Sequence, residues 1–316
     1  IKSINALYPN KTIDTQMNIV RDKVKCINTK YTGKGISIAF IDTGICKNND
    51  FDSRIKCFYD VVNHKNYVYD DCGHGTHVAG ICSGSGANSN GKYRGIAPES
   101  NIVMIKALDF EGKGTASDVL TGIQWIADNC KKYNIRILNM SIGAGITNTK
   151  DPLVRAAEIL WDMGIVVVAA AGNNGPQKGT ISSPGISKKI ITVGSADDIN
   201  VPENDIGKSY SGRGPTKECV IKPDVVAPGT NIISCLCEDN KSNNYYKSLS
   251  GTSMSTPIVS GAIALLLEKA PDLKPDDIKF MLKQSCHNLE CSPNRQGWGL
   301  LDIENLLNRE VVYVRK

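Results

Sequence analysis

The sequence has 316 residues, of which 41% are hydrophobic and 22% charged, as is usual for a soluble globular protein and unusual for a disordered chain. Its net charge is +5, and residues of both signs are interspersed without a long block of lysine and arginine. The charge pattern therefore gives little support for binding to nucleic acid. The longest apolar stretches, residues 164–172 and 261–267, are too short to cross a bilayer, which argues against a membrane-spanning segment.

The N-terminal residues 1–32 carry no diagnostic pattern. We expect them to be either an N-terminal arm packed on the rest of the chain or the remainder of a processed propeptide. Residues 33–316 show no internal repeat, low-complexity tract or linker, and α/β proteins of this length often have a single core. The sequence therefore predicts one large domain after residue 32.

Short runs rich in β-branched residues are predicted to be strands. Each run is apolar throughout, as expected for strands covered on both faces, and the runs are residues 35–42, 101–108, 135–142, 165–172 and 189–195. Helical patterns lie between them at residues 115–133 and 151–164. This alternation predicts an α/β fold with a doubly wound, mostly parallel sheet and helices on both faces. In such a sheet functional residues gather beyond the carboxyl ends of the strands, and Asp42 stands at one of these ends.

The eleven cysteines are predicted to be reduced thiols, because their number is odd and a chain of this size does not need disulfides to fold. Reduced thiols favour a cytoplasmic origin. The spacing of the cysteines lacks the paired CxxC pattern of a zinc site. We therefore interpret most of them, Cys46 included, as small packing residues.

Three polar residues, together with Asp42, have the types that acyl transfer requires: a nucleophile, a base, a carboxylate that orients the base, and a donor for the oxyanion. Ser253 lies where a Gly-Thr turn meets an apolar helix, His74 opens a glycine-punctuated helix, and Asn173 follows an apolar strand. Each also has a simpler explanation, since such a serine is usually an N-cap and such an asparagine a turn residue. His77 completes an HxxH pattern, but without HExxH this indicates a metal site only weakly.

The motifs around these residues favour the chemical interpretation when they are taken together. They read IDTGI, GHGTHVAG, AAGNNG and GTSMSTP in chain order. With them, the sequence from about residue 33 to residue 306 resembles the subtilisin-like serine proteases (subtilases, peptidase family S8), and within this family the intracellular AprX-type subtilases of Gram-positive bacteria. The resemblance implies a three-layer αβα fold and a peptidase catalytic domain over residues 33–316.

The resemblance also implies roles. Asp42 orients His74, His74 is the general base and then the acid, and Ser253 attacks the scissile carbonyl, while the amide of Asn173 and the backbone N–H of Ser253 hold the oxyanion. This is a serine endopeptidase that binds protein or peptide substrates as an extended strand and needs no cofactor for its chemistry. Alternatives are an inactive subtilase that only binds peptide, which the four intact positions disfavour, and a peptidase or transpeptidase dedicated to one precursor.

Substrate pockets follow from the same resemblance. Segments 111–115 and 141–145 flank an extended peptide, to which their glycines allow close backbone approach. The assigned residues are Ser141, Ile142, Gly143, Ala170, Gly172 and Ser182 for S1, with Ser182 at the floor, Leu108, Ala116 and Val119 for S4, Cys72 beside S2, and Gly112 and Gly114 on the edge. The absence of charge in S1 predicts a neutral, small to medium P1 residue, and the small Ala116 predicts a bulky apolar P4 residue. A thiolate at Cys72 near an imidazole predicts partial inhibition by thiol reagents.

A structural calcium ion is a further implication. The loop at residues 83–92 lies where many subtilases bind calcium, and its ligands here would be Asn88 and Asn90 together with Asp50. Oxygen ligands suit this ion, although the loop itself contains no carboxylate. The resemblance also predicts a cis peptide bond between Ser183 and Pro184.

Overall fold

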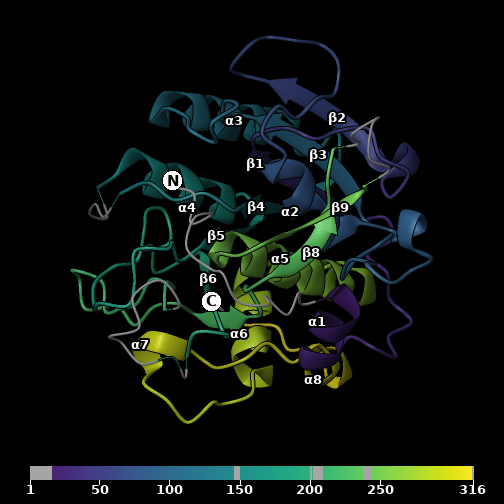
Figure 1. Cartoon of the computed structure of the whole chain (residues 1–316). Helices are drawn as coiled ribbons and strands as arrows, with labels where there is room; N and C mark the ends of the chain where they lie inside the picture. Colours follow the sequence, from purple (N-terminus) through teal and green to yellow (C-terminus); the bar gives the residue numbers. More distant parts are fainter. Residues whose placement is uncertain (1–15, 146–149, 200, 202–208, 238–243, 315–316) are drawn as a thin grey trace.

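A parallel sheet of seven strands forms the centre of the molecule in the computed structural model, which describes residues 16–145, 150–199, 201, 209–237 and 244–314 (Figure 1). Neighbouring strands pair in parallel throughout, in the order β2-β3-β1-β4-β5-β6-β7. In chain order the strands are β1 (Ser37–Asp42), β2 (Ile55–Asp60), β3 (Asn101–Lys106), β4 (Ile135–Met140), β5 (Val166–Ala170), β6 (Ile191–Ser195) and β7 (Val225–Ala227).

The five predicted strands are all present, each shorter than its apolar run because residues at the ends of the runs lie in loops. Two strands of this sheet were not predicted, and neither was the separate pair of strands at residues 232–235 and 246–249. The edge strand β2 is mostly half-exposed, so it lacks the continuous apolar pattern, and β7 has only three residues. The predicted α/β fold with a doubly wound parallel sheet is confirmed.

Helices cover both faces of this sheet (Figure 1). On one face, α2 (His74–Ser83) packs against α5 (Thr252–Lys269), and α5 runs along β4 to β7. On the other face, α3 (Ala116–Asn129) packs against α4 (Pro152–Asp162). Because α5 is apolar on all sides, it is buried between the sheet and the remaining helices.

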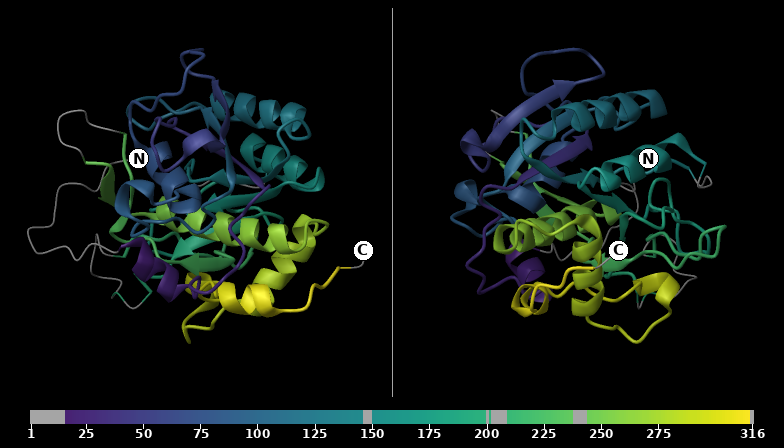
Figure 2. Two further views of the ribbon diagram at one scale, coloured as in Figure 1. Left: turned by 90° about the vertical axis from the view of Figure 1, so that its right-hand side faces the viewer. Right: turned by 180° about the vertical axis from the view of Figure 1, so that it is seen from behind.

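The smaller elements close the remaining sides. They are α1 (Met17–Lys23), the 3-10 turns η1 (Asp52–Arg54) and η2 (Ala87–Ser89), the antiparallel pair β8 (Ile232–Cys235) and β9 (Tyr246–Leu249), and the helices α6 (Pro275–Ser285), α7 (Pro293–Gln296) and α8 (Ile303–Asn308). Figure 2 shows α1 beside α8. The buried side chains of Met17 and Val20, and a bond from the Ile303 N–H to the Val24 carbonyl of 2.9 Å, attach this N-terminal segment to the domain.

An aromatic stack joins the edge strand to a helix. The ring of Trp125 on α3 stacks on Tyr59 of β2, with centroids 5.2 Å apart, and on Tyr133, with centroids 5.7 Å apart. Such contacts stabilise the packing of α3 on a strand that has a neighbour on one side only.

A buried charge cluster closes the amino edge of the sheet. The Lys222 ammonium group donates to the carbonyl of Ile190 and the hydroxyl of Thr192, both at 3.0 Å, and to the carboxylate of Asp224. Burial lowers the pKa of Lys222 to about 8, although the charge of Asp224 opposes this shift. Lys279 of α6 lies 3.5 Å from the same carboxylate. All these groups lie at the beginnings of β6 and β7, far from the strand ends that Asp42 marks.

One prediction about the cysteines is wrong. Cys46 and Cys237 form a disulfide, with Cα atoms 5.3 Å apart, so Cys46 is not a packing thiol. The other nine cysteines are free. The pair was missed because 191 residues separate its members, and such a distance leaves no local spacing to read.

Across the residues that the structure describes, no helix combines the length and the apolar character that crossing a bilayer would demand.

Candidate active site

Three strands deliver polar residues to the carboxyl edge of the sheet. Asp42 is the last residue of β1, Ser141 follows β4, and Asn173 lies three residues after β5. The helices α2 and α5, which pack against each other, carry His74 and Ser253 in their first turns. The fold thus gathers the four predicted catalytic positions, together with Ser141, around the starts of two helices.

The Asp42 carboxylate is 1% exposed and lies 2.7 Å from Nδ1 of His74. The same oxygen atom accepts the N–H of Thr43 at 2.8 Å. Because an ionised carboxylate only accepts hydrogen bonds, Nδ1 carries the proton and Nε2 is left with a free lone pair. This is the arrangement that a histidine base needs.

The pKa of His74 is raised. Burial alone would lower it, but the charge of Asp42 and the hydrogen bond to its carboxylate outweigh burial, and Asp70 adds to the upward shift. The side chain remains 22% exposed. The imidazole is therefore accessible and more basic than an ordinary histidine.

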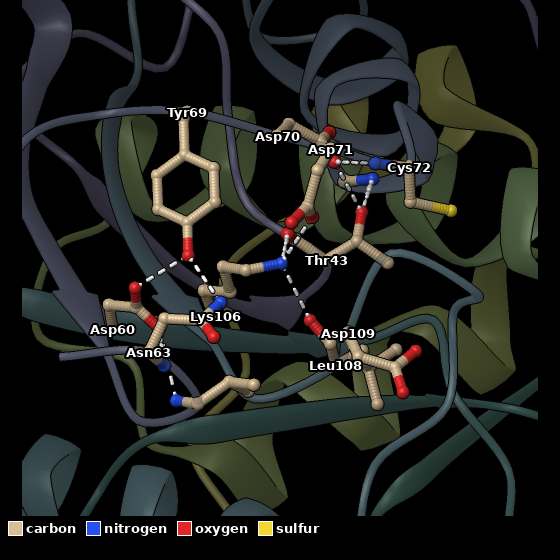
Figure 3. A network of polar contacts seen from close by, with 12 residues as sticks. Thr43, Asp60, Asn63, Tyr69, Asp70, Asp71, Cys72, Lys106, Leu108 and Asp109 are labelled. Atoms are coloured by element: carbon tan, nitrogen blue, oxygen red, sulfur yellow. Dashed lines mark hydrogen bonds and ion pairs between the residues drawn. The ribbon is translucent and has the colours of Figure 1, made fainter. Parts of the chain in front are cut away.

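Asp70 fixes the start of α2. One of its oxygen atoms accepts the N–H of Gly73 at 2.7 Å and the hydroxyl of Thr43 at 2.8 Å, and the other accepts the N–H and hydroxyl of Thr76 at 2.9 and 2.6 Å. Figure 3 shows this carboxylate between the loops. A negative charge at a helix N-terminus is stabilising, and here it also ties α2 to the residue next to Asp42.

Ser253 is the one residue of positions 252–267 that is not buried. Its hydroxyl donates to the carbonyl of Ser141 at 2.8 Å, and the Ser141 hydroxyl donates back to the Ser253 carbonyl at 2.8 Å. Behind Ser141, the amide of Asn139 donates to the Ser141 hydroxyl, and Ser260 donates to the oxygen of that amide. A chain of fully buried polar side chains thus holds the backbone of the half-buried Ser253.

Asn173 is attached to the same helix start. Its side-chain oxygen accepts both the N–H and the hydroxyl of Thr252 at 3.0 Å. Because the oxygen atom is used in this way, the NH₂ group is the donor that remains available to a ligand beside Ser253. The neighbouring Gly251 has a φ of 149°, and a Cβ atom there would stand 3.1 Å from this NH₂ group.

Comparisons with known proteins agree with this geometry. The model of the subtilase family matches residues 33–299. The chain belongs to the subtilase family. It is 44% identical over 297 residues to the serine protease AprX of Bacillus subtilis, which covers 87% of this chain and 66% of that protein, and 35% identical over 288 residues to subtilisin DY of Bacillus licheniformis, which covers 90% and 95%.

Solved structures show the same fold. Sphericase superposes with a TM-score of 0.76 at 27% identity, over 90% of this chain and 96% of that one. A cold-adapted subtilisin-like serine proteinase superposes with a TM-score of 0.70 at 32% identity, over 87% and 91%. The chain is a subtilisin-like serine protease of class EC 3.4.21.-, and it spans 66% of the length of AprX.

The S1 candidates of this subtilase come together around Ser182. A Cβ atom on Gly143 would approach that of Ser182 to 2.9 Å, and one on Gly172, where φ is 90°, would clash with the Ser182 hydroxyl. Asn174 donates to this hydroxyl at 3.3 Å. The N–H of Ala144 bonds to the Ser183 carbonyl at 3.0 Å, which joins the two sides. Ser141, Ile142 and Ala170 are buried beside them, and the predicted cis bond from Ser183 to Pro184 is present.

The S4 and S2 candidates separate into buried and exposed residues. Leu108 and Val119 are buried, whereas Ala116 at the start of α3 is exposed. A Cβ atom on Gly114 would stand 2.7 Å from the Leu108 side chain, and one on Gly112 would stand 3.8 Å from the sulfur of Cys72. These glycines therefore lie against the positions assigned to S4 and S2.

Cys72 is exposed, but its electrostatics differ from the prediction. Partial burial raises the pKa of its thiol, and the carboxylates of Asp70 and Asp42 raise it further, against the lowering effect of a hydrogen bond from the His74 backbone. At neutral pH the thiol is therefore protonated, because partial burial and the two carboxylates both disfavour the thiolate. The reactive thiolate that the sequence suggested is disfavoured.

Two of the three predicted calcium ligands, Asp50 and Asn88, already accept hydrogen bonds from protein donors. One oxygen atom of the buried Asp50 accepts the N–H of Asn88 at 3.0 Å, and the other accepts the hydroxyl of Tyr246 at 2.8 Å and lies 3.3 Å from the sulfur of Cys235. The side-chain oxygen of Asn88 accepts from Asn49. Hydrogen-bond donors occupy the positions that a Ca²⁺ ion would take. In the part of the chain that the structure describes, no group of three acidic, histidine or cysteine side chains could hold a metal.

The second histidine of the HxxH pattern has a structural role. Nε2 of His77 donates to the carbonyls of Ile232 and Lys247, at 3.0 and 2.9 Å, and so ties α2 to the β8 and β9 pair. Burial lowers its pKa to about 3, which keeps this imidazole neutral. His74 is therefore the titrating histidine of the pair.

Sequence reasoning missed two charged residues near the site. Asp70 was passed over although it precedes the GHGTHVAG motif, and Lys106 was read as part of an apolar run although it is charged. Lys106 is fully buried at the end of β3, directly opposite Asp42 in the pairing of β1 with β3. A lysine at the end of a continuous apolar strand was the available signal, because such a residue is rarely buried without partners.

Proposed function

We propose that this subtilase is a serine endopeptidase that works through an acyl-enzyme. The observation that carries the proposal is the hydrogen bond between Asp42 and Nδ1 of His74, beside a helix start where Ser253 is only half-buried and Asn173 is held by its oxygen atom. Nε2 of His74 takes the proton of Ser253 as the hydroxyl attacks the substrate carbonyl, and later gives it to the leaving amine. Water then releases the acyl group by the same steps.

The oxyanion is held by two donors, the NH₂ group of Asn173 and the backbone N–H of Ser253 at the start of α5. Both are fixed before substrate arrives, so little reorganisation is needed in the transition state. In the free protein the Ser253 hydroxyl donates to the Ser141 carbonyl, so the side chain turns toward His74 when substrate binds. Catalytic hydrogen bonds are often incomplete in unliganded enzymes.

The specificity that we propose is a neutral, small to medium P1 residue and a bulky apolar P4 residue. Its support is the Ser182 side chain packed against Gly143 and Gly172, which shortens S1, and the small exposed Ala116, two residues after the Gly114 that lies against Leu108. Substrate would bind as an extended strand between segments 111–115 and 141–145. Tetrapeptide nitroanilides with different P1 and P4 residues test this proposal, and a preference for charged P1 residues would contradict it.

A fluorophosphonate probe tests the mechanism itself. We expect labelling of the wild type and of Ser255→Ala, and none of Ser253→Ala. Ser255 is a matched control because it lies on the same helix and its hydroxyl is buried against the Ala227 carbonyl. If the folded wild type is not labelled, the peptidase proposal fails and the peptide-binding alternative remains. Digestion of a peptide library separates a general endopeptidase from one dedicated to a single precursor, which would cut very few sequences.

We further propose that the domain does not depend on calcium, because the Asp50 carboxylate is already satisfied by protein donors.

We propose that residues 16–32 are an arm packed on the catalytic domain of residues 33–316, on the support of the buried Met17 and Val20. We propose a cytoplasmic location, which the nine free cysteines support. The disulfide between Cys46 and Cys237 is an argument against it.

A further inference from the structure

Lys106 lies where three loops of the proposed site meet (Figure 3). Its ammonium group donates to the carbonyl of Thr43 at 2.7 Å, to the carbonyl of Leu108 at 2.8 Å and to the carboxylate of Asp71 at 2.6 Å. The ring of Tyr69 covers it with its centroid 5.1 Å away. An ammonium group has three donors, so every one of them is used.

Each partner of Lys106 lies directly next to a residue with a proposed role. Thr43 follows Asp42 in the chain, and Asp71 follows Asp70, the carboxylate that holds the start of α2. Leu108 is itself assigned to S4, and its N–H bonds to the Asp42 carbonyl at 3.2 Å. The lysine therefore connects the loop that orients the base, the loop before His74 and the edge along which substrate would pair.

We infer that Lys106 is a positioning residue, which sets the geometry of Asp42 and of the substrate-binding edge from beneath the site. A buried ammonium group must be fully satisfied, so its three acceptors are held at fixed distances from one another. This inference rests on the proposed peptidase function. It goes beyond the roles of the catalytic residues, because the orientation of the base and the register of the substrate would both depend on the ammonium group of Lys106.

The chain offers a matched control for the burial of a lysine. Lys222 is also fully buried and also has three acceptors, here a carbonyl, a hydroxyl and a carboxylate, but it lies at the amino edge of the sheet. Replacing either lysine with methionine removes a buried charge and leaves acceptors without a donor. Both variants should lose stability, and only one of them should lose catalytic efficiency.

The experiment compares wild type, Lys106→Met and Lys222→Met on two substrates, a small ester that fills S1 alone and a tetrapeptide amide that reaches S4. The concentration of active sites is measured by fluorophosphonate titration, so unfolded protein does not count. For Lys106→Met we expect kcat on the ester to fall by about 10- to 100-fold, as for a small misplacement of catalytic groups. We expect a larger loss of kcat/KM on the tetrapeptide, since the Leu108 edge shifts as well. Lys222→Met should stay within about twofold of wild type on both substrates.

Two results would overturn the inference: a Lys106→Met enzyme within twofold of wild type, or an equal loss in Lys222→Met. If Lys106→Met does not fold, Asp71→Ala and Asp224→Ala replace the pair, because each removes the carboxylate partner of one lysine. Asp71→Ala should then lower kcat/KM on the tetrapeptide by about fivefold. If the loss in Asp71→Ala is no larger than the loss in Asp224→Ala, the inference is rejected. A wild type without hydrolysis would instead reject the proposed function, so the two failures are distinguishable.

Discussion

The carboxyl edge and the amino edge of the sheet contain similar groups but use them differently. Each contains a fully buried lysine paired with an aspartate, Lys106 with Asp71 at the carboxyl edge and Lys222 with Asp224 at the amino edge. At the amino edge both partners are buried, and helix α6 adds a third charge. At the carboxyl edge Asp71 is 36% exposed and the loops nearby are rich in glycine. Buried polar groups thus stabilise one edge and orient a reactive surface at the other.

The largest effect that tests this contrast is expected from Asp42→Asn. The amide can hold His74 in the wrong tautomer, so kcat should fall by about 10,000-fold, or about 5.5 kcal/mol of transition-state stabilisation. The free energy of unfolding should change much less. Steady-state kinetics and urea unfolding on the same sample measure kcat and the free energy of unfolding. If the loss of activity is explained by unfolded protein alone, the contrast between the two edges is contradicted.

The opposite result is expected at the amino edge for Asp224→Ala. Removing one partner of a buried ion pair should lower the free energy of unfolding by about 3 to 5 kcal/mol. Values of kcat and KM per active site should remain those of the wild type, because the partners of this carboxylate, Thr192, Lys222 and Lys279, belong to the amino-edge cluster. A change in kcat would show that the two edges are coupled.

Asn173→Ala should remove one oxyanion donor and lower kcat by about 100- to 1,000-fold, a magnitude taken from the corresponding donor of subtilisin itself. KM should change little, since the interaction is made mainly in the transition state. Because the Asn173 oxygen also caps α5 through Thr252, a loss of stability of about 1 kcal/mol should accompany the change. Asn173→Asp serves as the control, since it keeps the capping oxygen and removes the donor.

Two histidines of α2 should respond to pH in opposite ways. The pKa of His77 is lowered to about 3, so below pH 6.5 the unfolded chain binds a proton that the folded chain does not. The contribution of this residue to stability is therefore complete above pH 6.5 and is lost by about 1.4 kcal/mol per pH unit as pH falls toward 3. In urea unfolding at several pH values, the slope of the wild type should exceed that of His77→Gln by this amount. The raised pKa of His74 places the acidic limb of kcat/KM above pH 6.5.

The smallest effect is expected from removal of calcium. Because protein donors already satisfy Asp50, neither EDTA nor added Ca²⁺ should shift Tm. A ligand that binds only the folded state raises Tm as its concentration rises above Kd, so thermal scans at several calcium concentrations provide the measurement. A rise in Tm with calcium would mean that these loops rearrange around the ion.

Much of the fold could be predicted because its signals are local. The strands from β1 to β6 that are covered on both faces appear as continuous apolar runs, and Pro152 and Gly164 mark the ends of a helix directly. The edge strand β2 has one exposed side and gives no such run. Its place beside β3 depends on pairing with a strand about 45 residues further along the chain, which no local pattern encodes.

The candidate site was predictable only in part for the same reason. The motifs around His74 and Ser253 are contiguous and specific, whereas the roles of Asp70 and Lys106 arise from contacts between loops. The proposed independence of calcium could not be read from the sequence, because the donors that satisfy Asp50, such as the Tyr246 hydroxyl, come from a distant segment. Likewise, the partner of Cys46 could not be read from spacing.

The placement of the tryptophans gives the molecule two separate optical reporters. Trp125 stacks between Tyr59 and Tyr133 beside the edge strand, whereas Trp161 and Trp298 each lie 5.9 Å from the Lys279 ammonium group in the amino-edge cluster. Indole fluorescence depends strongly on nearby charge and solvent. A protein with phenylalanine at positions 161 and 298 would emit from Trp125 alone, so detachment of the edge strand could be followed by spectroscopy while the other end of the sheet remains silent.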